Sequence, residues 1–228
     1  MRYALCLEYL GSDFYGWQTQ LQSPTVQECV ESALASVADH PISVTCAGRT
    51  DTGVHALGQV VHFDTHVERT ERSWVLGCNS HLAEGVSALW VRAVADDFNA
   101  RFSAESRSYR YRILNRWVRP AVKSNLVCWV RSVLDERAMD AAAKELLGEH
   151  DFSSFRGIYC QSKTPVKTLH RLELFQRGNL IVVEAEANAF LMHMVRNITG
   201  TLMAVGTGKK PPEWVKTVLE ARNRSVAA

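Results

Sequence analysis

No stretch of this 228-residue chain approaches the roughly 20 consecutive apolar residues that a membrane-spanning helix needs. The chain also lacks low-complexity segments and Pro- or Gly-rich linkers, and its N-terminus enters a strand-like pattern without the apolar core of a signal peptide. Its six cysteines include no close pair, which excludes a Cys-x-x-Cys zinc or redox motif and favours free thiols. These absences predict a globular protein of the cytoplasm.

Net charge is also small, at +2, but the charges are unevenly distributed. From Asn99 to Lys123 seven basic residues stand against one acidic residue. Within this block, Tyr109-Arg110-Tyr111-Arg112 alternates along a strand expected at Ser108–Asn115, with the tyrosines on one face and the arginines on the other. Guanidinium groups suit phosphates and aromatic faces suit unstacked bases, so the block favours an RNA or DNA partner. The alternative is a tyrosine core face with solvated arginines.

One loop contains a carboxylate and a guanidinium that turn geometry does not require. The stretch Gly48-Arg49-Thr50-Asp51-Thr52-Gly53-Val54-His55-Ala56 lies between two alternating apolar runs, and therefore joins two strands. Its glycines satisfy the turn, which leaves Arg49 and Asp51 unexplained. In the structural interpretation, Asp51 caps its own turn and Arg49 is solvated. In the functional interpretation, both belong to a site.

The remaining pattern predicts two successive α+β halves, residues 1–100 and 101–228. In the first half we expect a strand at Tyr3–Leu10, a helix opened by the capping box Thr25-x-x-Glu28, a helix at Glu71–His81 and a strand at Ser87–Val94. In the second half we expect, after the basic strand, a helix at Asp135–Leu147, strands at Val166–Phe175 and Asn179–Ala187, and a helix at Phe190–Val205.

Three smaller features leave alternatives open. The aromatic segment 13–18 is either a lid or a loop tucked under the sheet. Arg196 lies in an otherwise apolar helix, where a charge usually has a partner, and Asp51 is a candidate for it. His62 and His66 fall on one face of a strand, but a metal site would need further convergent ligands.

These segments together resemble the tRNA pseudouridine synthase A family over almost the whole chain. The Asp51 loop is the most specific part of the resemblance, and the other matching segments follow in the same order along the chain. They are Phe14 with Gly16-Trp17-Gln18, Phe102-Ser103-Ala104, Arg107-Ser108-Tyr109-Arg110-Tyr111, His150-Asp151-Phe152-Ser153-Ser154-Phe155, and Phe190-Leu191 with Met194-Val195-Arg196-Asn197-Ile198.

The resemblance implies a fold, an activity and site residues. The fold would be α+β, with two ferredoxin-like halves that share a central, mostly antiparallel sheet, helices packed on it and a catalytic cleft between the halves. The protein would be a homodimer that isomerises uridine to pseudouridine in the anticodon stem-loop of tRNA, at positions 38, 39 and 40, without a metal or organic cofactor. Asp51 would be the catalytic residue and Tyr109 would stack on the target base, with Arg49 and Arg196 as basic partners.

Several alternatives stay open at this point. An ionised carboxylate can attack either C1′ of the ribose or C6 of the base, and Arg49 can orient the loop or the RNA. Two other functions also fit: a tRNA-binding module without activity, and a glycosidic hydrolase that releases free base, although the loop lacks an obvious second carboxylate. The sequence ends at Ala228, where relatives usually continue into a closing strand, so we expect an unpaired sheet edge in the second half.

Overall fold

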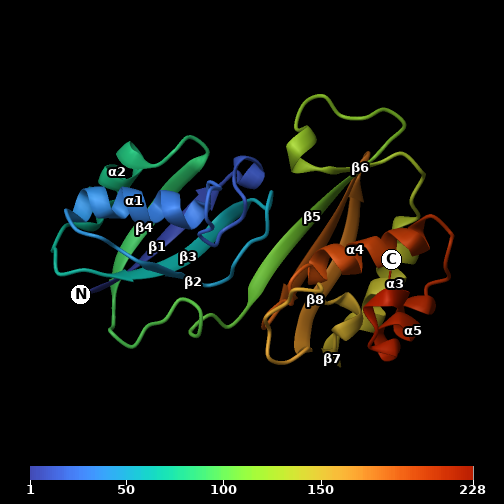
Figure 1. The fold of residues 1–228 in the computed structure, drawn as a ribbon. Helices are drawn as coiled ribbons and strands as arrows, with labels where there is room; N and C mark the ends of the chain where they lie inside the picture. The colour runs from blue at the N-terminus through green and yellow to red at the C-terminus, as the bar shows by residue number, and fades with distance from the viewer. Residues whose placement is uncertain (228) are drawn as a thin grey trace. The chain divides into compact units, whose positions relative to one another are not determined.

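The computed structural model describes residues 1–227 and divides the chain into two compact units, Met1–Glu105 and a second unit that begins at Ser106. Each unit consists of one β-sheet with its own helices (Figure 1). The α+β class predicted from the sequence is confirmed. A sheet shared by the two halves and a cleft between them stay predictions.

The first unit has the βαββαβ order of a ferredoxin-like fold. Its elements are β1 (Arg2–Tyr9), α1 (Val26–Ala38), β2 (Val44–Cys46), β3 (Ala56–Asp64), α2 (Glu71–His81) and β4 (Val86–Val94). The four strands are ordered β2-β3-β1-β4, and each neighbouring pair is antiparallel. The loop that carries Asp51 connects β2 to β3, as the sequence predicts.

Alternation along β1 explains how this unit forms its core. Tyr3, Leu5 and Leu7 point to one face of the sheet, where they join a buried cluster with apolar residues of α1 and α2. Helix α1 begins where the capping box predicts, because the Thr25 hydroxyl accepts a hydrogen bond from the Glu28 amide. Helix α2 matches its predicted bounds, and Thr70 caps it in the same way.

The second unit is built on a five-stranded sheet in the order β6-β5-β9-β8-β7. Its elements are β5 (Arg107–Asn115), β6 (Cys128–Val130), α3 (Glu136–Ala143), β7 (Gly148–Asp151), β8 (Val166–Arg177), β9 (Leu180–Ala187), α4 (Met194–Gly206) and α5 (Trp214–Ala221). Strand β5 pairs antiparallel with β9 along most of its length, whereas β6 runs parallel to β5 over Ile113–Asn115. Residues of β5, β8 and β9 form one core with α3, α4 and α5.

The last predicted helix starts later than the sequence suggests. Residues 190–193 are not helical, and α4 begins at Met194 because His193 adopts the left-handed conformation, with φ +61°. The predicted helix at 135–147 is α3 followed by a 3₁₀ turn, Lys144–Leu146. Strands β6 and β7 and helix α5 were not among the predicted elements.

Candidate active-site elements

The Asp51 loop is fastened to the sheet of the first unit on the side that precedes Asp51. Near its start, the Gln59 amide donates to the carbonyl of Gly48 at 2.5 Å, and Gln59 is only 8% exposed. The Tyr9 hydroxyl lies 2.8 Å from the Thr50 hydroxyl. Because Tyr9 and Gln59 belong to neighbouring strands, the sheet sets the position of the residue just before Asp51.

The aromatic segment before α1 packs against the same loop. The Trp17 amide donates to the carbonyl of Thr50 at 3.0 Å, and the Gly11 amide donates to Nδ1 of His55 at 3.0 Å. Phe14 and Trp17 are buried in the core, and Tyr15 is exposed. Of the two interpretations open from sequence, the segment is therefore a loop tucked against the core and not an aromatic lid.

Close approach explains the glycine in this aromatic segment. Gly16 has φ +86°, and a Cβ atom there would lie 2.9 Å from the carbonyl oxygen of Thr50 and 3.2 Å from the carbonyl carbon of Asp51. Any larger residue would push the loop backbone away. The contact therefore requires glycine for steric as well as conformational reasons.

Asp51 itself is half-buried and begins a tight turn. Its carbonyl accepts a hydrogen bond from the Val54 amide at 3.1 Å, and Gly53 within that turn has φ +77°. The backbone that carries the carboxylate is thus fixed on both sides, which is what a catalytic group needs in order to keep one geometry.

Arg49 is exposed and shares its surroundings with a second arginine. Burial raises the pKa of the Cys46 thiol to about 11, while the positive charges of Arg49 and Arg101 oppose this rise. Both guanidinium groups therefore act on the end of β2 from which the loop departs. Arg101 belongs to the basic block but was not predicted as a site residue. It directly precedes Phe102-Ser103-Ala104, one of the segments that carry the family resemblance, and this position is the sequence feature that could have indicated it.

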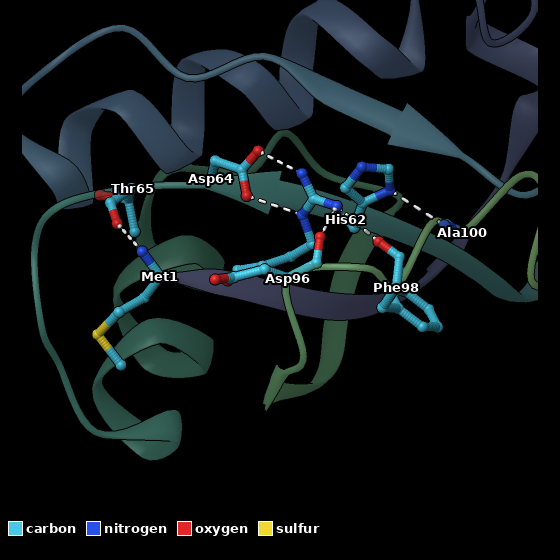
Figure 2. A network of polar contacts seen from close by, with 8 residues as sticks. Met1, His62, Asp64, Thr65, Asp96, Phe98 and Ala100 are labelled. Carbon is cyan, nitrogen blue, oxygen red and sulfur yellow. Dashed lines mark hydrogen bonds and ion pairs between the residues drawn. The ribbon is translucent and has the colours of Figure 1, made fainter.

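A polar network holds the segment that carries Arg101 (Figure 2). The guanidinium of Arg2 pairs with Asp64 at 2.8 Å and also donates to the carbonyls of Asp96 and Phe98, at 2.5 and 2.9 Å. His62 accepts a hydrogen bond from the Ala100 amide through Nδ1 at 3.1 Å. Strands β1 and β3 thereby fix the chain up to the residue before Arg101.

Tyr109 lies at one end of the core face of β5 in the second unit. Tyr111 and Ile113 follow it on the same face, with Ile113 fully buried and Tyr111 partly buried against the core. The ring of Phe190 meets the ring of Tyr109 edge to face, with centroids 5.0 Å apart. This contact orients the half-buried Tyr109 ring, as expected of a residue that stacks on a base.

Arg196 lies in the first turn of α4 and is exposed, not enclosed in an apolar face. Burial and a hydrogen bond with Cys128 raise the pKa of Tyr111 to about 12, and the charge of Arg196 acts in the opposite direction. The guanidinium is therefore near the core face of β5 that also carries Tyr109. The predicted partnership of Arg196 with Asp51 stays a prediction.

The arginine face of β5 is less available for phosphate than the alternation predicts. Arg110 pairs with Glu184 on β9, with 2.7 Å between Nε and Oε1, and Glu184 also lies 3.4 Å from Arg171 on β8. Part of the basic charge is thus neutralised across the sheet. The Arg110 side chain is still 51% exposed, so its contact with phosphate stays a prediction.

The two histidines considered for a metal site, His62 and His66, each contact a residue of the protein. His62 is occupied by the Ala100 amide, and the ring of His66 stacks on His40, with centroids 4.4 Å apart. Within residues 1–227 there is no group of three or more His, Cys, Asp or Glu side chains arranged to hold a metal ion. No helix in that range has the length and apolar character needed to cross a membrane.

Comparison with known proteins assigns both units of the chain to one family. The family model described as tRNA pseudouridine synthase matches residues 5–103 and 142–228. The chain is 55% identical to tRNA pseudouridine synthase A of Alcanivorax borkumensis over 228 residues, which is all of this chain and 85% of that protein. It is 52% identical to the protein of that name from Coxiella burnetii over 223 residues, or 98% of this chain and 85% of that protein. For the Vibrio vulnificus protein of that name the identity is 49% over 227 residues, covering all of this chain and 86% of that protein. The chain therefore belongs to the tRNA pseudouridine synthase family.

Proposed function

We propose that this protein isomerises uridine to pseudouridine in the anticodon stem-loop of tRNA, at positions 38, 39 and 40, with Asp51 as the nucleophile. Family membership supports the reaction, and the observation that carries the assignment to Asp51 is the fixed loop. The Gln59 side chain and the Trp17 amide hold the carbonyls of Gly48 and Thr50, and the Tyr9 hydroxyl holds the Thr50 side chain. A loop that served only as a turn would not need these anchors.

In the proposed reaction the bond between ribose C1′ and uracil N1 breaks, the uracil rotates, and a bond forms between C5 and C1′. The C5 proton is lost and N1 gains a proton, so the reaction is an isomerisation without oxidation or reduction. The ionised carboxylate of Asp51 attacks C1′ or C6 to start the sequence. Tyr109 provides a flat face that retains the freed uracil while it turns, and its hydroxyl would assist removal of the C5 proton.

The basic residues have separate roles in this proposal. Arg196 compensates the charge of Asp51 when the site closes around the base, and Arg49 orients the loop or the RNA. Extracting the base from its stack costs a few kcal/mol, which phosphate contacts of the basic surface must offset. The protein would act as a homodimer in the cytoplasm, the compartment that also suits its six free cysteines.

Release of tritium from tRNA containing 5-tritiated uridine tests the proposal, because the reaction removes the hydrogen at C5. We expect Asp51→Ala to lower turnover on the order of 10⁶-fold, as loss of the nucleophile does in subtilisin. Asp97→Asn is the matched control, since it removes an exposed carboxylate of the same unit. Appreciable pseudouridine formation by Asp51→Ala would exclude Asp51 as the nucleophile.

The same assay separates the alternatives. A wild-type protein that binds tRNA but releases no tritium would be a binding module, and detection of free uracil would indicate a hydrolase.

Tyr109→Ala is expected to lower kcat more than tRNA affinity, because the ring acts on the freed base. An equal loss of both would reduce Tyr109 to a binding role. Tyr109→Phe, which keeps the ring, isolates the contribution of the hydroxyl.

A further inference from the structure

The connection between β5 and β6, residues 116–127, is a long loop that extends beyond the end of the sheet of the second unit (Figure 1). It exposes two apolar side chains to an unusual degree: Trp117 is 71% exposed and Val122 is 80% exposed. Tryptophan is enriched at interfaces, where its apolar body and polar tip can both be used. The proposed active-site residues do not account for this loop.

The loop is a built structure and not a loose connection. Asn115 at its base donates to the carbonyls of Val130 and Ser132, at 3.0 and 2.6 Å, and accepts from the Leu134 amide at 3.1 Å. The indole of Trp129 donates to the carbonyl of Arg116 at 2.9 Å. These bonds tie Asn115 and Arg116, where the loop leaves β5, to residues 129–134, where the chain returns to the sheet.

One cation–π pair stands at the centre of this surface. The guanidinium carbon of Arg131 lies 3.8 Å from the centroid of the Trp117 ring, which is a close stacking distance. The Nε atom of Arg116 donates to the carbonyl of Val118 at 2.8 Å, which keeps that guanidinium beside the loop backbone. We call the residues Arg116, Trp117, Arg119 and Arg131 the Trp117 patch.

Charge identifies the chemistry of the partner. Residues 116–134 contain four basic residues and no acidic one. Nucleic acid presents phosphates to guanidinium groups and bases to aromatic faces, so a basic segment with an exposed Trp and no carboxylate fits nucleic acid. One face of Trp117 carries the Arg131 guanidinium, and the exposure of the residue leaves room for a base on the other face.

The position along β5 indicates which part of the RNA this surface reaches. Strand β5 continues for six residues beyond Tyr109, to Asn115, which is about 20 Å at the rise of a β-strand, and Trp117 follows two residues later. At 3.4 Å per stacked nucleotide, about 20 Å corresponds to roughly six nucleotides of one strand. Resting on the proposed function, in which Tyr109 holds the target base, we infer that the Trp117 patch binds the tRNA outside the anticodon arm. Its guanidinium groups contact phosphates there, and Trp117 stacks on an unpaired base.

Binding of two RNA probes tests this inference. The probes are a whole tRNA and a short hairpin that comprises only the anticodon arm. We expect Trp117→Ala to weaken binding of the whole tRNA by about 5- to 100-fold, the range for loss of one stacked base. The hairpin, which lacks the distant nucleotides, should discriminate far less between wild type and variant. Trp117→Phe keeps an aromatic face and should restore most of the affinity for whole tRNA.

Salt dependence isolates the phosphate contacts. Removing Arg116 and Arg131 together, as Arg116→Gln and Arg131→Gln, should lower the slope of log K against log salt by about one for each phosphate that the variant no longer binds. Arg137→Gln on α3, also an exposed arginine of the second unit, is the matched control and should leave the slope unchanged.

Two results would overturn the inference. Wild-type affinity of Trp117→Ala for whole tRNA would show that the patch does not bind RNA. A change in the oligomeric state of Trp117→Ala, measured by light scattering, would make the loop a contact between protein chains. Failure of the proposed function is recognised separately, because wild type would then make no pseudouridine on either probe.

Discussion

Gly16 offers a way to disturb the Asp51 loop without touching a charged or polar side chain. Its φ of +86° costs an L-residue about 1–2 kcal/mol. In Gly16→Ala the new Cβ would lie 2.9 Å from the Thr50 carbonyl oxygen and 3.2 Å from the Asp51 carbonyl carbon. Since both neighbours are backbone atoms, the overlap can be relieved only if the loop moves.

Both effects can be measured. Overpacking of this kind adds about 1–3 kcal/mol to the backbone strain, and for a chain of this size each kcal/mol lost from the free energy of unfolding lowers Tm by about 2–4 °C. A displaced catalytic group loses rate more steeply, since a shift of about 1 Å can cost 100-fold. We therefore expect Gly16→Ala to lower kcat by about 10- to 100-fold in the tritium-release assay, while the protein remains folded at the assay temperature.

Gly208→Ala separates loop displacement from backbone strain. Gly208 has φ +72°, and the position of its Cβ is more than 4 Å from the non-neighbouring heavy atoms of the described residues. This variant should lose stability through strain alone and keep the kcat of wild type. If Gly16→Ala retained wild-type kcat, or if Gly208→Ala lost as much kcat, the argument that Gly16 positions Asp51 would be refuted.

Two further predictions concern titratable groups. Burial, followed by the charge of Arg2, holds the pKa of His62 below 6.5 despite the opposing effect of Asp64. Between that lowered pKa and 6.5 the unfolded chain binds more protons than the folded chain, so the free energy of unfolding should fall as pH drops from 7 to 5. Thermal unfolding of wild type and His62→Gln across this range measures the effect, and parallel curves would contradict it. Burial raises the pKa of Cys160, but hydrogen bonds from Ser162, Met192 and Arg156 outweigh it and leave that pKa below its ordinary value. Burial raises the pKa of Cys46 to about 11 and that of Cys78 to about 12. Because the thiolate is the nucleophile, iodoacetamide at pH 8 should modify Cys160 before the other two, as peptide mass mapping can check. Earlier modification of Cys46 or Cys78 would contradict the predicted order of thiol reactivity.

Short-range signals in the sequence were sufficient for much of the first unit. The capping box at Thr25 predicts the start of α1, and the apolar spacing predicts α2 at Glu71–His81, because caps and helical faces depend on residues a few positions apart. The same holds for the alternation around the Asp51 loop, which predicts a connection between two strands. Family resemblance then assigned Asp51 and Tyr109 their expected roles.

Features that depend on distant partners could not be predicted in this way. Strands β6 and β7 have three and four residues, and they exist only through pairing with β5 and β8. Arg110 carries a charge that the sequence makes available for RNA, yet Glu184, 74 positions away, pairs with it. The shift in the start of α4 likewise follows from the left-handed backbone of His193, which no periodicity reveals.

By itself, the sequence determined the α+β class, the place of the Asp51 loop between two strands, and the alternation that puts Tyr109 and Tyr111 on one face of β5. Only the tertiary structure decided how that loop is held. Tyr9, Gly16 and Gln59 converge on it from three segments of the first unit. Local pattern reports the conformation of neighbouring residues, whereas the position of the loop that carries Asp51 depends on contacts that the folded chain brings together from far apart in the sequence.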